Sequence, residues 1–243
     1  MTLPSPACIF PGVPQKRATA TAQARSAPGK KRDAGRIVVH PLTPDRWSDI
    51  EALFGARGAC GGCWCTYWRK TRPEYERGKG DANRAHFRAV VKDGEHPPGV
   101  IAYIGGKPVG WCAVAPREEY VRLRTSRVLK PVDDQPVWAV TCFYIDRTHR
   151  GRGLSVALLK GATDLARRAG AEVVEGYPVD PRGGRQADVF VYTGLASAFL
   201  RAGFKEVARR SPTRPILRKR MTKQGAPKPR NSVDSKPSRA PGR

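Results

Sequence analysis

The sequence predicts a mixed α/β domain between two unfolded tails. Short runs of branched apolar residues alternate with segments in which apolar residues recur at helical spacing. Two adjacent glycines, Gly105 and Gly106, separate a pair of apolar runs, as the two-residue turn of a β-hairpin requires. The chain has 243 residues, of which 40% are hydrophobic, and this suits one full-sized domain with a buried core.

Residues 36–221 carry the folding pattern, and each of their elements ends at a plausible boundary residue. Strands are expected where β-branched and aromatic residues cluster, and helices where apolar residues share one face. The expected strands are 36–39, 100–104, 108–114, 137–145, 172–177, 205–208 and 216–217. The expected helices are 44–54, 83–91, 120–123, 156–166 and 195–199, with Phe87, Val90 and Val91 on the buried side of the second.

The two ends, residues 1–35 and 222–243, lack hydrophobic periodicity, which predicts disordered basic tails. Each carries six Lys or Arg and one Asp, so ten of the 24 net positive charges lie there and +14 remains on residues 36–221. A positive excess favours anionic partners such as nucleic acid or phosphate-bearing cofactors. The Arg, Ala and Ser content of the first tail is also compatible with an organelle transit peptide.

Several classes of protein are disfavoured by composition. No stretch approaches the roughly 18 apolar residues of a membrane helix, and the first 35 residues lack the apolar core of a secretory signal. Six cysteines are too few for a disulfide scaffold of this length. We therefore expect a cytoplasmic protein with no membrane partner.

The segment from Arg150 to Ser155, RGRGLS, joins the best strand to an amphipathic helix. A glycine-rich turn at a helix start presents unpaired backbone N–H groups and the positive end of the helix dipole. Arg150 and Arg152 add forked donors for phosphate oxygens. The segment therefore predicts phosphate binding, although it matches neither of the common nucleotide-binding fingerprints.

This segment resembles motif A of the GNAT acetyltransferase superfamily, [Q/R]-x-x-G-x-[G/A], with Arg150 first and Gly153 fourth. Ser155 stands where Gly or Ala is usual. The order of elements over residues 36–221 and the ending FLRAGFKEV are also similar to the family. The resemblance implies a GNAT-like, mostly antiparallel central sheet flanked by helices, and acyltransferase activity.

By this resemblance the chain is an N-acetyltransferase whose cofactor is acetyl-CoA and whose acceptor is a small-molecule or protein amine. A backbone N–H near Phe143 or Tyr144 would polarise the thioester, as preorganised donors do in acyl transfer. The implied cofactor-binding residues are Phe143, Tyr144, Ile145, Arg150, Gly151, Arg152, Gly153, Leu154 and Ser155.

The catalytic candidates are Tyr192 and Glu175. Phe199 occupies the position where the family often has a Tyr that protonates the departing thiolate, so the usual acid is missing or relocated. Tyr192 falls seven residues earlier and is a candidate for a displaced acid or a packing residue. Glu175 is a candidate base; Glu118 and Glu119, in the long connection 116–136, are less favoured because solvated charge explains them.

The segment ACGGCWCTYWR, residues 59–69, admits three interpretations. Cys60, Cys63 and Cys65 have a spacing compatible with Zn²⁺, with a fourth ligand from Cys112, His86 or His96. Small cysteines and large aromatics also suit a buried loop, and we favour this interpretation over a metal site. In the third, Trp64, Tyr67 and Trp68 clamp the acceptor, since aromatic side chains suit a flat or cationic group.

Two rival functions stay open at this stage. A Cys-rich, zinc-organised nucleic-acid-binding protein would account for the charge, and a GNAT fold without catalysis would account for Phe199. The sequence indicates neither the acceptor nor the oligomeric state.

Overall fold

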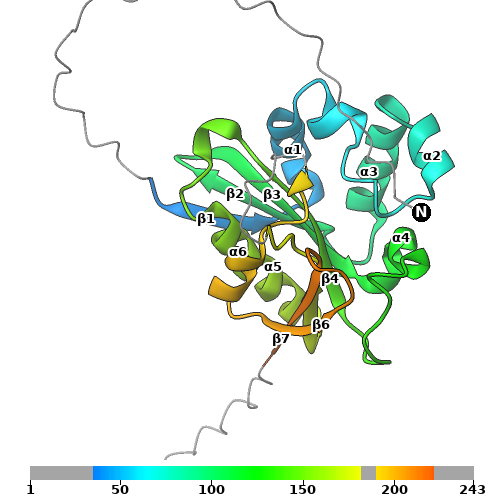
Figure 1. Cartoon of the computed structure of the whole chain (residues 1–243). Helices are drawn as coiled ribbons and strands as arrows, with labels where there is room; N and C mark the ends of the chain where they lie inside the picture. Colours follow the sequence, from blue (N-terminus) through cyan, green and yellow to red (C-terminus); the bar gives the residue numbers. More distant parts are fainter. Residues whose placement is uncertain (1–34, 182–189, 222–243) are drawn as a thin grey trace, which may run out of the picture.

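The computed structural model describes residues 35–181 and 190–221, so the predicted tails lie outside the described residues except for Gly35. A single sheet runs through the middle of the domain (Figure 1). Its strands are β1 (Ile37–Pro41), β2 (Gly99–Ile104), β3 (Lys107–Pro116), β4 (Trp138–Ile145), β5 (Val173–Gly176), β6 (Lys205–Arg209) and β7 (Pro215–Arg220). They follow the order β1-β2-β3-β4-β5-β7-β6, and every neighbouring pair is antiparallel except β4 and β5. The predicted mostly antiparallel mixed fold is confirmed.

Helices cover both faces of the sheet, with α1 and α3 on one face and α5 and α6 on the other (Figure 1). The helices are α1 (Trp47–Phe54), α2 (Arg72–Arg77), α3 (Asp81–Asp93), α4 (Val121–Thr125), α5 (Leu154–Arg168) and α6 (Ala196–Arg201). The five helices expected from the sequence are all present. Helix α2 was not expected, because its six residues bury only Tyr75 and so give no periodic signal.

Each face of the sheet has its own hydrophobic core. On one face Leu158, Leu159 and Ala162 of α5 are fully buried against the sheet. On the other face Trp111 of β3 is fully buried, and its ring meets those of Phe54 and Phe87 edge-on. In α3, Phe87 and Val91 face this core as predicted, whereas Val90 is only half-buried. The buried face of α3 is therefore narrower than the helical periodicity predicted, by the one residue Val90.

The pairing of β4 with β5 is short, and this opens the sheet at the end of β4. Only Trp138, Ala139 and Val140 are in register with β5. At the next residue, Thr141, the pairing of β4 with β3 also shifts by one residue, which is a β-bulge. A bulge bends its strand, so the second half of β4 diverges from β5.

A buried ionic network holds the region beside this opening. Glu175 of β5 is fully buried, and its carboxylate accepts hydrogen bonds from Tyr177 Oη at 2.6 Å and Arg218 Nε at 2.6 Å. Arg117 forms an ion pair with the same carboxylate at 3.4 Å and donates to the backbone oxygen of Leu129 at 2.7 Å. The network therefore connects β5, β7 and the long connection between β3 and β4.

No helix among residues 35–181 and 190–221 is long and apolar enough to cross a membrane.

Replacing Glu175 with Ala should destabilise the domain strongly. The change leaves the buried Arg117 guanidinium without a carboxylate and takes one of two from Arg218, which keeps Asp133 at 2.7 Å; breaking a buried ion pair in this way costs about 3–5 kcal/mol. Urea unfolding should show a lower midpoint with an unchanged slope. The matched control is Glu118→Ala, since Glu118 is exposed and its loss should change the free energy of unfolding by less than about 0.5 kcal/mol. Equal midpoints for the two variants would contradict a structural role for Glu175.

Candidate active site

The RGRGLS turn leads from the end of β4 into helix α5. Gly151 and Gly153 have φ angles of +75° and +80°, in the left-handed region that favours glycine. Gly153 is the N-cap of α5, and its carbonyl accepts from Val156 and Ala157 at 3.1 and 3.2 Å. Leu154 is buried and anchors the first turn of the helix in the core. The turn is thus set by local backbone conformation and by one apolar anchor.

The exposed side of this turn is basic. Arg147, Arg150 and Arg152 are exposed, and Arg150 Nε donates to the backbone oxygen of Ile145 at 3.2 Å, which ties the turn to the end of β4. The first N–H groups of a helix have no partner within the helix, and α5 has 15 residues to align its peptide dipoles. The arrangement has the features of a phosphate site: helix N–H groups without a partner in the helix, the positive end of the helix dipole and nearby guanidinium groups.

The backbone N–H of Phe143 lies on the open side of β4. It donates to the backbone oxygen of Tyr192 at 2.6 Å, so it points away from β3. The N–H of Asp146 instead donates to the backbone oxygen of Val109 in β3, at 3.0 Å. Because strand N–H groups alternate in direction, the N–H of Tyr144 also points toward β3. Of the two amides proposed from the sequence, only that of Phe143 faces the opening.

The segment before α6 lies directly against this part of β4. Gly194 has a φ of +86°, and a Cβ there would lie 2.9 Å from the rings of both Phe143 and Phe199. Phe199 itself is fully buried and packs edge-on against Phe143 and Phe204. The position that carries a Tyr in the family is therefore part of the core in this chain.

Tyr192, Tyr67 and Trp68 come together beside the Phe143 amide. The ring centroid of Tyr192 lies 6.0 Å from that of Tyr67 and 6.5 Å from that of Trp68. Burial, and then the neighbouring Tyr67, raise the pKa of the Tyr192 hydroxyl, so it keeps its proton at neutral pH. Tyr192, a candidate acid in the sequence, thus forms one cluster with Tyr67 and Trp68 of the proposed acceptor clamp, and we call this cluster the aromatic wall.

Trp64 does not join this wall. It is buried in the core, where its ring lies 6.1 Å from Trp47 and 5.8 Å from Phe54. The interpretation of Trp64 as part of the acceptor clamp is not supported by this position. The difference from Tyr67 and Trp68 arises in the backbone, because Trp64 and Cys65 have φ angles of +41° and +52° and turn the chain between them.

The cysteines do not converge on a metal site in the described parts of the chain. Cys60 is exposed, Cys63 is half-buried and Cys65 is buried, and residues 35–181 and 190–221 contain no group of three His, Cys, Asp or Glu side chains that could hold a metal ion. Trp111 Nε1 donates to Cys65 Sγ at 3.1 Å. Hydrogen bonds from Cys142 and from Trp111 lower the pKa of the Cys65 thiol, against the effect of burial. The buried-loop interpretation accounts for these contacts.

The carboxylates proposed as bases are either enclosed by partners or exposed. Glu175 is held by Tyr177, Arg218 and Arg117 as described above, and both of its oxygens have partners. Glu118 and Glu119 are exposed, and Glu119 pairs with Arg69. This geometry favours a structural role for Glu175.

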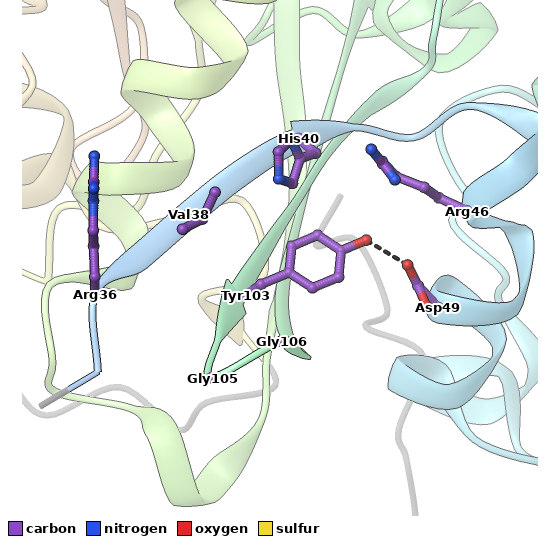
Figure 2. Close-up of a pocket in the computed structure, with 8 residues that line it drawn as sticks. All are labelled: Arg36, Val38, His40, Arg46, Asp49, Tyr103, Gly105 and Gly106. Carbon is purple, nitrogen blue, oxygen red and sulfur yellow. Dashed lines mark hydrogen bonds between the residues drawn. The ribbon is translucent and has the colours of Figure 1, made fainter. Parts of the chain in front are cut away.

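A separate hollow lies at the opposite edge of the sheet (Figure 2). It has a volume of about 280 Å³, and Tyr103 on its floor donates from its hydroxyl to Asp49 Oδ2 at 2.6 Å. It is lined by residues of β1 and β2, and strand β3 lies between β2 and β4. Its lining residues are Arg36, Val38, His40, Arg46, Asp49, Tyr103, Gly105 and Gly106. It is therefore not part of the site built on β4.

Comparison with known proteins gives the class of protein to which this geometry belongs. Residues 63–181, which include Tyr67 and Trp68 and run through β5, match the acetyltransferase (GNAT) family. No curated protein sequence matches the chain significantly. The chain carries an acetyltransferase domain of the GNAT family.

Solved structures with a similar arrangement are distant in sequence. A GNAT acetyltransferase from Listeria monocytogenes is 12% identical, with a TM-score of 0.46, over 76% of this chain and 95% of its own. The PaiA N-acetyltransferase from Thermoplasma acidophilum, solved with coenzyme A, is 13% identical, with a TM-score of 0.44, over 76% and 99%. A polyamine N-acetyltransferase from Drosophila melanogaster has the same identity and TM-score, over 76% and 100%. At these scores the family match alone carries the assignment.

Sequence reasoning missed the arginines beside the aromatic wall. The guanidinium carbon of Arg122 lies 3.9 Å from the ring centroid of Tyr67, and that of Arg69 lies 5.0 Å from the ring centroid of Tyr120. In a chain with 45 Lys and Arg residues, one in a loop and one in the short helix α4 gave no signal. Only their burial against aromatic rings distinguishes them.

The five described cysteines should differ in their reactivity toward iodoacetamide. Cys60 is exposed and should be alkylated first in the native protein, whereas burial raises the pKa of the Cys112 thiol and removes the thiolate that reacts. Peptide mass spectrometry after a short native reaction should find label at Cys60 and none at Cys112. In denaturant both should be labelled, and this serves as the control. Native labelling of Cys112 as fast as Cys60 would contradict the packing of the core.

Proposed function

We propose that this chain transfers the acetyl group of acetyl-CoA directly to the amine of a small acceptor at the aromatic wall. The observation that carries the proposal is the juxtaposition at the end of β4. There a left-handed glycine turn opens helix α5, and the amide of Phe143 faces the gap in the sheet beside Tyr192. A phosphate site and an amide donor on one strand suit a long phosphorylated thioester cofactor.

The RGRGLS turn would hold the pyrophosphate of acetyl-CoA. Its exposed glycines let the backbone approach an anion closely, and Arg152 can neutralise phosphate charge. Ser155 is half-buried in the first turn of α5, so its small side chain leaves room beside the N–H groups. The cofactor supplies an acyl thioester whose thiolate, with a thiol pKa near 8.5, is an acceptable leaving group.

The Phe143 amide is the candidate oxyanion donor. It now donates to the carbonyl of Tyr192, so donation to a thioester oxygen requires an exchange between these two acceptors. Preorganised N–H donors at the oxyanion position are worth roughly 10²–10³ in kcat. The residue's side chain is in the core, which keeps the amide in place.

Tyr192 is the candidate general acid for the departing thiolate. Its ring packs in the aromatic wall and its backbone carbonyl accepts from Phe143, so the residue is held at both its side chain and its backbone. Because burial raises its pKa, the hydroxyl is protonated at neutral pH and can donate a hydrogen bond to the departing thiolate, although the same shift makes complete transfer of its proton less favourable. We do not assign a general base, since the described carboxylates near the site already have partners or are exposed.

The rival function, a zinc-organised nucleic-acid binder, finds no support. It required a metal site at Cys60, Cys63 and Cys65. These three side chains differ in burial, and residues 35–181 and 190–221 contain no group of three possible metal ligands.

Acetyl-CoA should stabilise the full chain against heat. At 100 times its Kd, a ligand that binds only the native state raises the free energy of unfolding by about 2.7 kcal/mol. The variant Arg152→Glu should weaken acetyl-CoA binding by about tenfold or more, because it reverses a charge at the turn. Its control is Arg168→Glu, the same change at an exposed position at the far end of α5. No melting shift at millimolar acetyl-CoA, or equal loss in both variants, would overturn the proposal.

Tyr192→Phe should lower kcat and leave the KM for acetyl-CoA nearly unchanged. The variant keeps the backbone carbonyl and the ring but removes the proton donor, and general acids contribute about 10²–10⁴ in rate. Because the pKa of Tyr192 is raised above its ordinary value, the wild-type rate should not fall through loss of this proton between about pH 7 and 9.

Tyr103→Phe is the matched control for the loss of a hydroxyl. Tyr103 lies at the opposite edge of the sheet, and burial raises its pKa as well. Thiol release should be unaffected in this variant. A Tyr192→Phe enzyme with the wild-type kcat would show that Tyr192 only packs.

A further inference from the structure

Buried polar atoms without a hydrogen-bond partner gather in one part of the molecule. Six such side-chain atoms occur among the described residues, and Trp47 Nε1 is the one that lies elsewhere. The other five are Trp68 Nε1, Arg69 Nη2, Tyr120 Oη, Arg122 Nη2 and Thr141 Oγ1, which we call the donor cluster. Within it the hydroxyls of Tyr120 and Thr141 lie close enough to interact with each other, so the donors that lack any partner among the described residues are the three nitrogen atoms. Buried polar groups in native proteins are nearly always paired, so a concentration of unpaired donors needs an explanation.

The donor cluster is continuous with the aromatic wall. The backbone oxygen of Trp68 accepts from the N–H of Arg122 at 3.2 Å, and the Arg122 guanidinium covers the ring of Tyr67. The other side of Trp68 packs in the same apolar cluster as Tyr120. Thr141 is the bulge residue of β4, two positions before Phe143. The unpaired donors therefore border the place proposed for the acceptor.

The charge of the cluster is positive. The Arg69 side chain is only 7% exposed, and its Nη1 pairs with Glu119 while its Nη2 has no partner. Arg122 donates from Nε to the backbone oxygen of Lys70 at 3.1 Å and forms no ion pair with any described residue. Glu76, whose pKa Arg122 helps to lower, pairs with Lys79 at 2.5 Å. Of these two guanidinium groups, only that of Arg69 has a carboxylate partner among the described residues.

From these contacts we infer that the acceptor amine also bears a carboxylate, which the donor cluster binds. This rests on the proposed function and names the class of substrate: an amino acid or a related amino carboxylate. A carboxylate has two oxygens that accept several hydrogen bonds, and guanidinium and indole N–H groups only donate. A cationic polyamine would place its second charge against Arg69 and Arg122.

Matched pairs of acceptors test this class with the full chain and acetyl-CoA. L-Phenylalanine is compared with L-phenylalaninamide, and β-alanine with β-alaninamide, by release of free thiol. The KM of each acid should be at least about tenfold lower than that of its amide, because the amide cannot take the charged hydrogen bonds. The α-amine of an amide is less basic than that of the acid, so amine reactivity near neutral pH favours the amide and cannot create the expected preference.

Two variants locate the preference. Arg122→Gln and Arg69→Gln should each raise the KM of the acids about tenfold and leave the KM of the amides unchanged. Arg124→Gln, an exposed arginine on the same helix as Arg122, is the control and should change neither. Two variants at separate positions keep the test decisive if one of them fails to fold.

Calorimetric titration of the same pairs into the protein with CoA present separates this inference from the proposed function. Acid binding that is tighter than amide binding supports the carboxylate site even if no thiol is released. Equal affinities, a preference for putrescine or the amides, or an acid preference that survives both arginine variants would overturn the inference. An absence of acetyl-CoA binding in the melting experiment would overturn the proposed function instead.

Discussion

The candidate site depends on the parting of β4 from β5. The two strands share three residue pairs, and the bulge at Thr141 then turns β4 away. The first half of β4 is an ordinary core strand, whereas the second half keeps one edge available. That edge carries the Phe143 amide and leads directly into the RGRGLS turn. Without the bulge, β5 would use the backbone donors that the proposed chemistry needs.

Where β4 and β5 diverge, the sheet is stabilised by a network of buried ion pairs beside the gap. Glu175 joins β5 to β7 through Arg218 and to the long connection through Arg117. A carboxylate in the interior is stable only when it is paired, so these residues hold one another in a single arrangement. The same connection then continues into Tyr120 and Arg122, so the network also positions one side of the donor cluster.

Most of the fold follows from local patterns. The hairpin at Gly105 and Gly106, the helices of both faces and the turn before α5 all occur where spacing and turn residues predicted them. Such elements are encoded in short windows, because periodicity and glycine conformations depend on near neighbours. Helix α2 was not predicted, because it buries a single residue. The buried face of α3 was predicted only in part, because its extent depends on what packs against it.

The sequence by itself determined where strands and helices form along the chain, the glycine-rich turn before α5 and the family resemblance. Only the tertiary structure decided that Trp64 belongs to the core while Tyr67 and Trp68 join Tyr192, and that Glu175 is enclosed by arginines. It alone brought Arg69, Arg122 and Thr141 to one place. The physical reason is that a side chain's burial and partners come from segments far apart in the chain, and no local window contains that information.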